Sequence, residues 1–277
     1  MTTTRTASAV SYGDTGIAEP ALLCLPGWCG DRTVFDPLVA QLAPVRRVLT
    51  LDLPDHGESP RTDEDFGTSC VVDQAVGVVE SAGLEQVVPV ALAHAGWMAL
   101  ELRRRLGPER VPAIVLVDWM VLGTPPGFTD ALGALQDEAA WEGVRASLFS
   151  MWTDGVEEPA VHEYVTSMGE YGFRHWSRAG REIARGFAAE PTPLAVLERL
   201  EVACPTLHLY AQPADEGYLA AQQDYAAAHP WFQVRRLDAT SHFPVLEAAA
   251  EMAAAVSELL ARVSPSENPD GWGRGRW

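Results

Sequence analysis

Long apolar segments are missing from this sequence of 277 residues. A helix that spans a bilayer needs about 18 or more consecutive apolar residues, and no such run occurs. The first 16 residues also lack the apolar region of a secretion signal. We therefore expect a cytoplasmic protein with no membrane partner.

Basic side chains are also scarce. The 20 Lys and Arg residues stand against 38 Asp and Glu residues, which gives a formal net charge of −18. The average field of such a chain repels phosphate backbones, so we expect no nucleic-acid partner. A small-molecule pocket inside this acidic shell can still have its own local potential.

Cysteine is rare and scattered, and this excludes two kinds of site. The four cysteines form no CxxC pair and have no histidine at ligand spacing, which argues against a disulfide framework and a structural zinc site. We expect small buried thiols at Cys24, Cys29, Cys70 and Cys204. No H-E-x-x-H, dinucleotide-binding or P-loop motif occurs either, so the sequence predicts no metal and no nucleotide cofactor.

Short apolar runs alternate with helical patterns through most of the chain, and this predicts an α/β fold with a mostly parallel sheet between helices. Expected strands cover residues 21–27, 46–54, 86–93, 113–119, 205–213 and 232–238. Apolar residues recur every three or four positions in the expected helices 35–43, 69–82, 96–106 and 246–263.

The connection after Trp119 is too long for an ordinary crossover, because about 85 residues pass before the next clear strand. We expect a helical cap at 122–199, inserted into a core formed by 1–121 and 200–263. The cap is rich in aromatic and Met residues, which either pack it onto the core or line a flat apolar pocket. The Pro- and Gly-rich tail, 264–277, is expected to be disordered.

The segment VVPVALAHAGW (87–97) is typical of a strand, a tight turn and a helix. Ala93 stands where the nucleophile-elbow motif G-x-S-x-G would have its serine, so the attacking hydroxyl is absent. By itself this is a weak signal. His94, the next residue, would offer its backbone N–H to an anion.

Other sequence motifs occur along the chain in the order expected for a site built around a nucleophile elbow. The first apolar strand ends in LPGWCG, where Gly27 and Trp28 could offer a second backbone N–H. The turn LDLPDHGES contains His56, for which we expect a structural role in the turn. Near the end of the chain, TSHFP places His242 in a loop before the last helix.

Taken together, these motifs resemble the α/β-hydrolase superfamily over residues 8–262. Within it, the sequence is most similar to the cofactor-independent 3-hydroxy-4(1H)-quinolone 2,4-dioxygenases. The likeness is carried by LPGWC (25–29), HAGW (94–97), VDW (117–119), FSMWTDG (149–155), AQP (211–213), HPWF (229–232) and SHFP (241–244).

The resemblance assigns roles to particular residues. It implies that His242 is the general base and Asp118 its acidic partner, and that Trp28 and Trp152 line the substrate pocket. His94 matches the histidine after the elbow serine.

Two positions depart from the family pattern. The family's elbow serine is Ala93 here, and the histidine that often follows the GWC motif is Gly30. Losing the serine removes acyl-enzyme chemistry but leaves proton abstraction possible.

The family likeness implies an oxidoreductase that works without a cofactor on a small aromatic substrate and O₂. The histidine would take the proton of the 3-hydroxyl, and the resulting anion would react with O₂ in a ring cleavage that releases carbon monoxide. A histidine suits the first step because its ordinary pKa is about 6.5 and a carboxylate behind the ring stabilises the imidazolium.

Alternatives remain open at this stage. Asp215 competes with Asp118 as the acid, since hydrolases of this fold often have theirs after the corresponding strand. The reaction could also be a non-oxidative lyase, cyclase or decarboxylase step, or the chain could be an inactive ligand-binding homologue. An ordinary esterase is opposed by Ala93.

Overall fold

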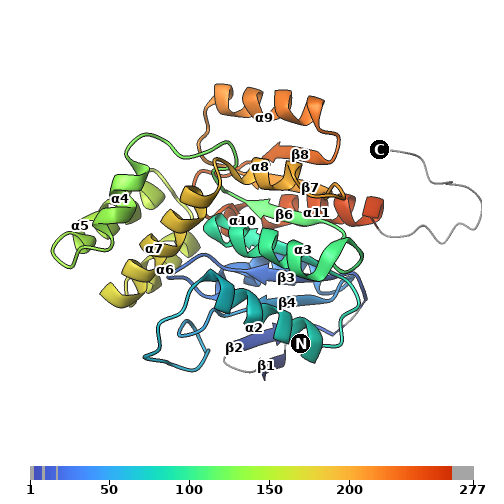
Figure 1. Ribbon diagram of the computed structural model, residues 1–277, viewed down its shortest axis with the longest axis horizontal. Coiled ribbons are helices and arrows are strands. Elements are labelled where there is room, and N and C mark those ends of the chain that lie inside the picture. The colour runs from blue at the N-terminus through green and yellow to red at the C-terminus, as the bar shows by residue number, and fades with distance from the viewer. Residues whose placement is uncertain (1–2, 8–9, 17, 264–277) are drawn as a thin grey trace, which may run out of the picture.

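The computed structural model describes residues 3–7, 10–16 and 18–263, and within them one eight-stranded sheet runs through the molecule (Figure 1). Its strand order is β1-β2-β4-β3-β5-β6-β7-β8. β2 pairs antiparallel with β1 and β4, and every other pairing is parallel. The strands are β1 (Thr3–Ala7), β2 (Val10–Asp14), β3 (Ala21–Leu25), β4 (Val48–Leu51), β5 (Val87–Leu92), β6 (Ile114–Val117), β7 (Thr206–Tyr210) and β8 (Phe232–Arg236).

All six predicted strands are present, as β3 to β8, and the predicted α/β class is confirmed. Every residue of β3, β4, β5, β6 and β7 is buried. Continuous apolar runs such as ALLCL suit this position because helices cover both faces of a parallel sheet. β1 and β2 were not predicted.

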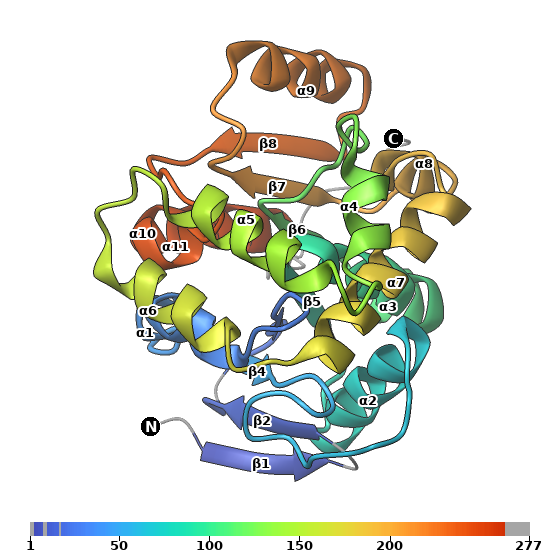
Figure 2. The same cartoon turned by 90° about the vertical axis from the view of Figure 1, so that its left-hand side faces the viewer.

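Helices cover the two faces of the sheet separately. Figure 2 shows α2 and α3 on one side and α1, α10 and α11 on the other. Their bounds are α1 (Asp36–Leu42), α2 (Thr68–Ser81), α3 (Gly96–Arg110), α10 (Pro244–Glu247) and α11 (Ala249–Val263), and α9 (Glu216–Ala228) packs against β8. The single helix expected over 246–263 is wrong, because the backbone leaves the helical region at Ala248 and divides α10 from α11.

Five helices lie between β6 and β7, in the region of the expected cap. They are α4 (Phe128–Ala134), α5 (Trp141–Thr153), α6 (Pro159–Met168), α7 (Phe173–Ala189) and α8 (Pro193–Glu198). α4 to α7 gather beyond one end of the sheet, at the left of Figure 1, whereas α8 packs against α3. The division into core and cap stays a prediction, and the tail 264–277 lies outside the described residues.

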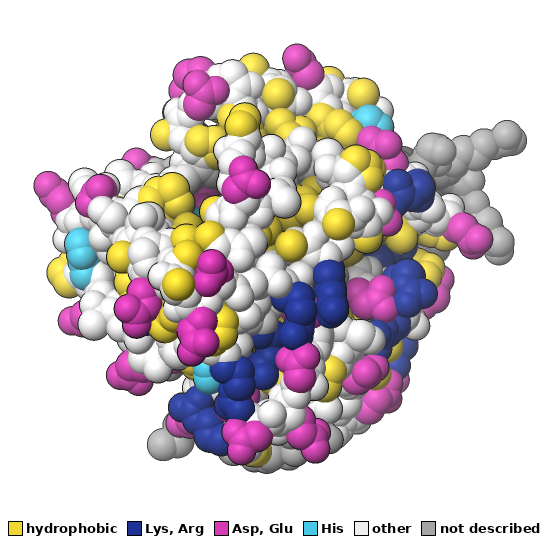
Figure 3. Space-filling model, turned by 60° about the vertical axis from the view of Figure 1, so that its left-hand side comes forward, with side chains coloured by type: hydrophobic (Ala, Val, Ile, Leu, Met, Phe, Trp, Pro, Cys, Tyr) yellow, Lys and Arg dark blue, Asp and Glu magenta, His cyan; other side chains and the backbone are white. Residues whose placement is uncertain are grey.

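Basic side chains form a band across the face shown in Figure 3, with acidic side chains beside it. The arginines of α7 are ion-paired: Arg174 with Asp63, Arg181 with Asp65, and Arg185 with Glu182. These pairs neutralise the cations locally. Within the described residues, none of the helices combines the length and hydropathy that a membrane crossing requires.

Candidate active site

A cavity of about 1060 Å³ lies between the carboxyl ends of the central strands and the helices that follow β6. Four parts of the chain contribute: the turns after β3, β5 and β6, the helices α4 to α7, the segment from the end of β7 into α9, and the loop before α10. All seven residues proposed from the sequence line it: Gly27, Trp28, Ala93, His94, Asp118, Trp152 and His242. Asp215, the competing acid, does not line this cavity.

His242 and Asp118 form a close pair at the cavity wall. The Nδ1 atom of His242 is 2.6 Å from Oδ2 of Asp118, although 124 residues separate them in the sequence. The carboxylate is almost fully buried, whereas a fifth of the His242 side chain is exposed. Because an ionised carboxylate only accepts hydrogen bonds, Nδ1 carries a proton and the Nε2 atom of neutral His242 holds the free lone pair.

The backbone fixes the position of Asp118. Its Oδ1 accepts hydrogen bonds from the N–H groups of Ala211 and Gln212, at 2.7 and 2.9 Å. Its own N–H donates to Leu209 at 2.8 Å, and its φ of +46° lies in the left-handed region. Asp215 is exposed and accepts from Tyr218 N–H as the cap of α9, so it is not the partner of His242.

Ala93 occupies the turn between β5 and α3. Its φ of +50° is unusual for a residue with a side chain, and it matches a sharp strand-to-helix turn. The helix that follows, α3, begins in close contact with Trp119, because a Cβ on Gly96 would lie 2.2 Å from the Trp119 ring. With a methyl group at position 93, no hydroxyl is available there for covalent attack.

Two tryptophans form aromatic walls of the cavity. The ring of Trp152, on α5, stacks on the His242 imidazole with centroids 5.3 Å apart and planes 15° apart. The ring of Trp28 stacks on Phe66, with centroids 6.2 Å apart. The cavity therefore has flat apolar surfaces beside one titratable pair, which suits an aromatic ligand.

His94 is held by the residue after Asp118. The indole Nε1–H of Trp119 donates to Nδ1 of His94 at 3.2 Å. Burial, and secondarily the nearby His242, lowers the pKa of His94 to about 3. His94 is therefore neutral near pH 7.

Gly30 leaves room for a side chain from the cap region. A Cβ at this position would lie 2.2 Å from the hydroxyl oxygen of Tyr164, which comes from α6. That hydroxyl accepts from Asp31 N–H at 3.1 Å and lies 3.2 Å from the Asp31 carbonyl. Tyr164 thus fills the space beside the GWC motif.

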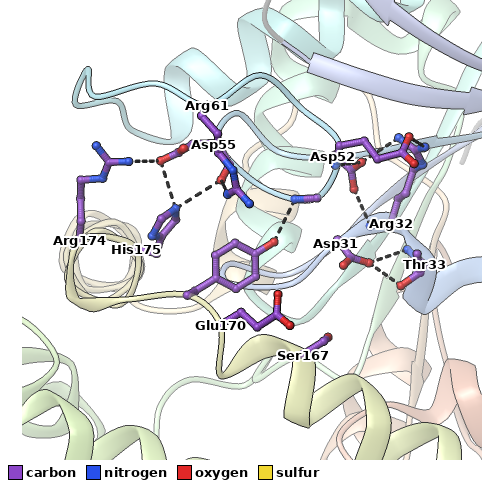
Figure 4. Close-up of a pocket in the computed structure, with 13 residues that line it drawn as sticks. Asp31, Arg32, Thr33, Asp52, Asp55, Arg61, Ser167, Glu170, Arg174 and His175 are labelled. Atoms are coloured by element: carbon purple, nitrogen blue, oxygen red, sulfur yellow. Dashed lines mark hydrogen bonds and ion pairs between the residues drawn. The ribbon is translucent and has the colours of Figure 1, made fainter.

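A second cavity, of about 570 Å³, lies between α7 and the loop 52–59 and is polar (Figure 4). Asp55 accepts from Arg174 at 2.8 Å and lies 3.1 Å from Nε2 of His175. The Tyr171 hydroxyl accepts from Gly57 N–H at 3.0 Å, and Asp52 pairs with Arg32 at 2.7 Å. The ion pairs of Arg174 and His175 with Asp55 therefore join α7 to the loop 52–59.

His56 lies in the turn, as expected from the sequence. Its Nδ1 is 2.7 Å from the Pro54 carbonyl, and its Nε2 accepts from Cys29 N–H at 3.3 Å. Burial lowers its pKa to about 3. These contacts give His56 a structural place in the turn.

Cysteines and histidines form no grouped ligand set in the part of the chain that is described. Cys24, Cys29 and Cys204 are buried free thiols, whereas Cys70 is only partly buried. No metal site follows from these residues.

Sequence reasoning missed Trp119, Trp176 and His208 as parts of the site. Trp119 and Trp176 line the cavity, and His208 accepts from Trp119 N–H at 3.3 Å. His208 is fully buried. The VDW motif that drew attention to Asp118 was the available signal for Trp119.

Comparisons with known proteins agree with this architecture. A family model described as "Alpha/beta hydrolase family" matches residues 22–255. The chain is 34% identical over 265 residues to the 2-heptyl-3-hydroxy-4(1H)-quinolone dioxygenase of Mycobacteroides abscessus, covering 94% of this chain and 98% of that one. It is 28% identical to the 1H-3-hydroxy-4-oxoquinoline 2,4-dioxygenase of Pseudomonas putida, covering 91% of this chain and 96% of that one.

A solved structure is similar over the same length. It is an AqdC variant in complex with its substrate, from work on recognition and ring cleavage of the Pseudomonas quinolone signal. The TM-score is 0.89 at 32% identity, with 95% of this chain and 100% of that chain covered. The resemblance stated from the sequence is thereby confirmed, and the chain belongs to the alpha/beta hydrolase family, in which its relatives include quinolone dioxygenases.

Proposed function

We propose that this protein is a cofactor-independent dioxygenase that cleaves the ring of a 2-alkyl-3-hydroxy-4(1H)-quinolone and releases carbon monoxide. His242 is the general base and Asp118 holds it in place. The observation that carries the proposal is the 2.6 Å pair of these residues in an aromatic-walled cavity that has Ala93 at the elbow. The names and near-complete coverage of the relatives support the substrate class.

The reaction begins with proton transfer. The free lone pair on Nε2 of His242 takes the proton of the substrate 3-hydroxyl, and Asp118 stabilises the imidazolium that results. The anion is electron-rich and reduces O₂, forming a C–O bond at C2. The peroxide then adds to C4, closing a bridge between the two carbons.

Collapse of this bridge balances the atoms and electrons. The O–O, C2–C3 and C3–C4 bonds break, C3 leaves with its own oxygen as CO, and both atoms of O₂ stay on C2 and C4. The proton on His242 passes to the product carboxylate or to solvent. The protein must therefore supply a base, an anion site and a pocket that excludes bulk water.

The apolar part of the cavity favours a substrate with an alkyl chain. Its volume of about 1060 Å³ lies just above the usual range for small-molecule pockets, so a bare bicyclic ring would leave much of it empty. Aliphatic side chains from α4 and its C-cap, α5 and α7 line the cavity, namely Leu132, Leu135, Val144, Leu148 and Ile183. Each methylene buried there would contribute about 0.8 kcal/mol.

The test uses purified protein treated with a chelator and checked for flavin by its absorbance. It is mixed with 2-heptyl-3-hydroxy-4(1H)-quinolone in air and under argon. We expect equal amounts of O₂ consumed and CO released in air, and no product under argon. Addition of Fe²⁺, Cu²⁺ or flavin should not raise the rate.

The matched variant is His242→Ala, which should lower kcat by at least about 100-fold, the lower range for loss of a general base. Product formation under argon would instead indicate a non-oxidative lyase, cyclase or decarboxylase. Tight binding without turnover by either protein would indicate a ligand-binding homologue. Either result would overturn the proposed function.

A further inference from the structure

Trp119 determines which nitrogen of His94 carries the proton. An indole N–H can only donate, so Nδ1 of His94 must accept its hydrogen bond through a lone pair. A neutral imidazole has a single N–H, and that proton is then on Nε2. His94 stays in this neutral form near pH 7 because burial lowers its pKa to about 3.

The Trp119 side chain is held firmly enough to set this orientation. Its indole packs edge-on to Trp97, with centroids 4.9 Å apart, and fills the space beside Gly96. Its carbonyl accepts from the Tyr218 hydroxyl at 3.2 Å. The backbone N–H of Trp119 donates to Nε2 of His208, so Trp119 is anchored through its backbone as well as its ring.

His208 is itself fixed on its far side. Its Nδ1 lies 2.5 Å from Oε1 of Gln222, a fully buried residue of α9. Since Nε2 accepts from Trp119 N–H, Nδ1 is the protonated nitrogen and donates to Gln222. Burial lowers the pKa of His208 to about 4, so this neutral arrangement also holds near pH 7.

The His94 ring belongs to the same cavity as His242. It lines the cavity and packs against Phe128 and Phe187, with centroid separations of 5.6 and 5.7 Å. Among the described residues, its Nε2 atom makes no hydrogen bond. In such apolar surroundings, a single N–H donor without a partner strongly favours the binding of a hydrogen-bond acceptor or an anion.

Asp118 and Trp119 thus give two histidines opposite roles. Asp118 accepts from Nδ1 of His242 and leaves a lone pair on its Nε2, whereas Trp119 donates to Nδ1 of His94 and leaves a proton on its Nε2. One ring is set to remove a proton, and the other is set to donate a hydrogen bond. Both settings are made by adjacent residues of one turn.

We propose that the Nε2–H of His94 donates a hydrogen bond to the oxygen anion that the substrate acquires when His242 removes its proton. His94 is then a catalytic residue, and Trp119 is a positioning residue that acts through it. This inference rests on the proposed function, which supplies the anion. No bond breaks at His94, since its proton stays on Nε2 while the negative charge on oxygen is stabilised.

The experiment measures binding without turnover. Under argon, native protein is titrated with 2-methyl-3-hydroxy-4(1H)-quinolone, and the bound anion is followed by its absorbance across pH. The control ligand is 2-methyl-4(1H)-quinolone, which has no 3-hydroxyl to ionise. The variants are His94→Leu, which removes the donor, His94→Gln, whose amide N–H lies near the Nε2 position, and Trp119→Phe.

We expect His94→Leu to bind the anion about 10- to 100-fold more weakly, the range for losing a hydrogen bond to a charged group. Its affinity for the control ligand should change by less than a few fold. His94→Gln should recover most of the anion affinity, and Trp119→Phe should lower the ratio of anion to control affinity. Nitrogen NMR of labelled native protein should find the His94 proton on Nε2.

Two results would overturn the inference alone. The first is an anion affinity in His94→Leu equal to that of native protein. The second is a loss of affinity that is equal for the anion and the control ligand in His94→Leu, His94→Gln and Trp119→Phe. If His94→Leu fails to fold, the ratio of the two affinities in His94→Gln and Trp119→Phe decides. Failure of native protein to bind either quinolone or to consume O₂ would instead remove the proposed function, and this inference with it.

Discussion

The Trp152 indole lies nearly parallel to the His242 imidazole, with ring centroids 5.3 Å apart and planes 15° apart. A histidine that acts as a base becomes a cation during the reaction, and an aromatic face stabilises a cation by about 0.5–2 kcal/mol. Trp152 comes from α5, so a helix between β6 and β7 contacts the proposed base directly.

Replacing Trp152 should therefore affect the chemical step as well as binding. We expect Trp152→Leu to lower kcat/KM by about 2- to 30-fold, following the cation–aromatic range. Trp152→Phe should lose less, since it retains an aromatic face. Steady-state kinetics on the heptyl quinolone checks this, and a Leu variant with native kcat would contradict the role of the stack.

Asp118→Asn should reduce kcat by about 10³-fold with little change in KM. The amide oxygen can still accept from Ala211 and Gln212, which leaves the NH₂ group facing Nδ1 of His242. The imidazole must then present a lone pair to that amide, and its Nε2 becomes protonated and cannot act as a base. Asp215→Asn is the control, and it should retain native turnover because Asp215 only caps α9.

Ala93→Ser tests whether the missing hydroxyl matters. In a ring-cleaving dioxygenase a serine here would add one hydrogen bond to the substrate, so we expect kcat/KM to change by less than about 10-fold. The same variant should hydrolyse p-nitrophenyl acetate no faster than native protein. An acyl-enzyme detected by mass spectrometry would show that one substitution restores hydrolase chemistry and would contradict this expectation.

Acid should destabilise the protein through buried neutral histidines. Burial lowers the pKa of His56 and His94 to about 3 and that of His208 to about 4, from an ordinary value of 6.5. Below pH 6.5 the unfolded chain binds protons that the folded chain does not, so the free energy of unfolding falls as pH falls towards the folded values. Each histidine contributes up to about 1.4 kcal/mol per pH unit in this window.

Urea unfolding at pH 7, 6 and 5 measures this dependence. The midpoint should fall steeply below pH 6.5, and a His208→Gln variant should have a shallower slope because it has one titrating group fewer. A midpoint that stays constant between pH 7 and pH 5 would contradict the neutral state of these three rings.

Asp55 should matter for stability because it lies among cations on α7. Its side chain is fully buried, with Arg174 at 2.8 Å and His175 at 3.1 Å (Figure 4). The buried Arg178 lies at 3.7 Å. Asp55→Asn has nearly the same shape and tolerates the φ of +65° at this position, but it leaves these cations without their carboxylate. We expect a loss of about 3–5 kcal/mol in the free energy of unfolding.

The matched control is Asp63→Asn. Asp63 also pairs with Arg174, but its side chain is fully exposed, so its loss should cost far less stability than the loss of Asp55. Denaturant unfolding of both variants gives the comparison. Equal losses would show that burial of the Asp55 cluster contributes nothing.

Much of the fold was predictable because its signals are local. Strands buried on both faces have continuous apolar runs, and β3 to β7 were found on that basis. β1 and β2 were missed because TTRTA and VSYGD are short and largely polar. The break at Ala248 was missed because the apolar spacing continues from α10 into α11.

The candidate site was only partly predictable. Motif order brought out His242 and the turn at Ala93, because each lies in a recognisable loop after a strand or before a helix, and the family resemblance brought out Asp118. The bond between Trp119 and His94 spans 25 positions, and the one between Trp119 and His208 spans 89. Such side-chain contacts leave no periodicity in the sequence, so only the folded arrangement reveals them.

Isotope labelling tests the central claim most directly. One turnover of 2-heptyl-3-hydroxy-4(1H)-quinolone under ¹⁸O₂ in ordinary water should give an organic product with two ¹⁸O atoms and carbon monoxide with none. The account requires this because both atoms of O₂ stay on C2 and C4 while C3 leaves with its own oxygen. A product whose new oxygen comes from water, or formation of product without ¹⁸O, would contradict it.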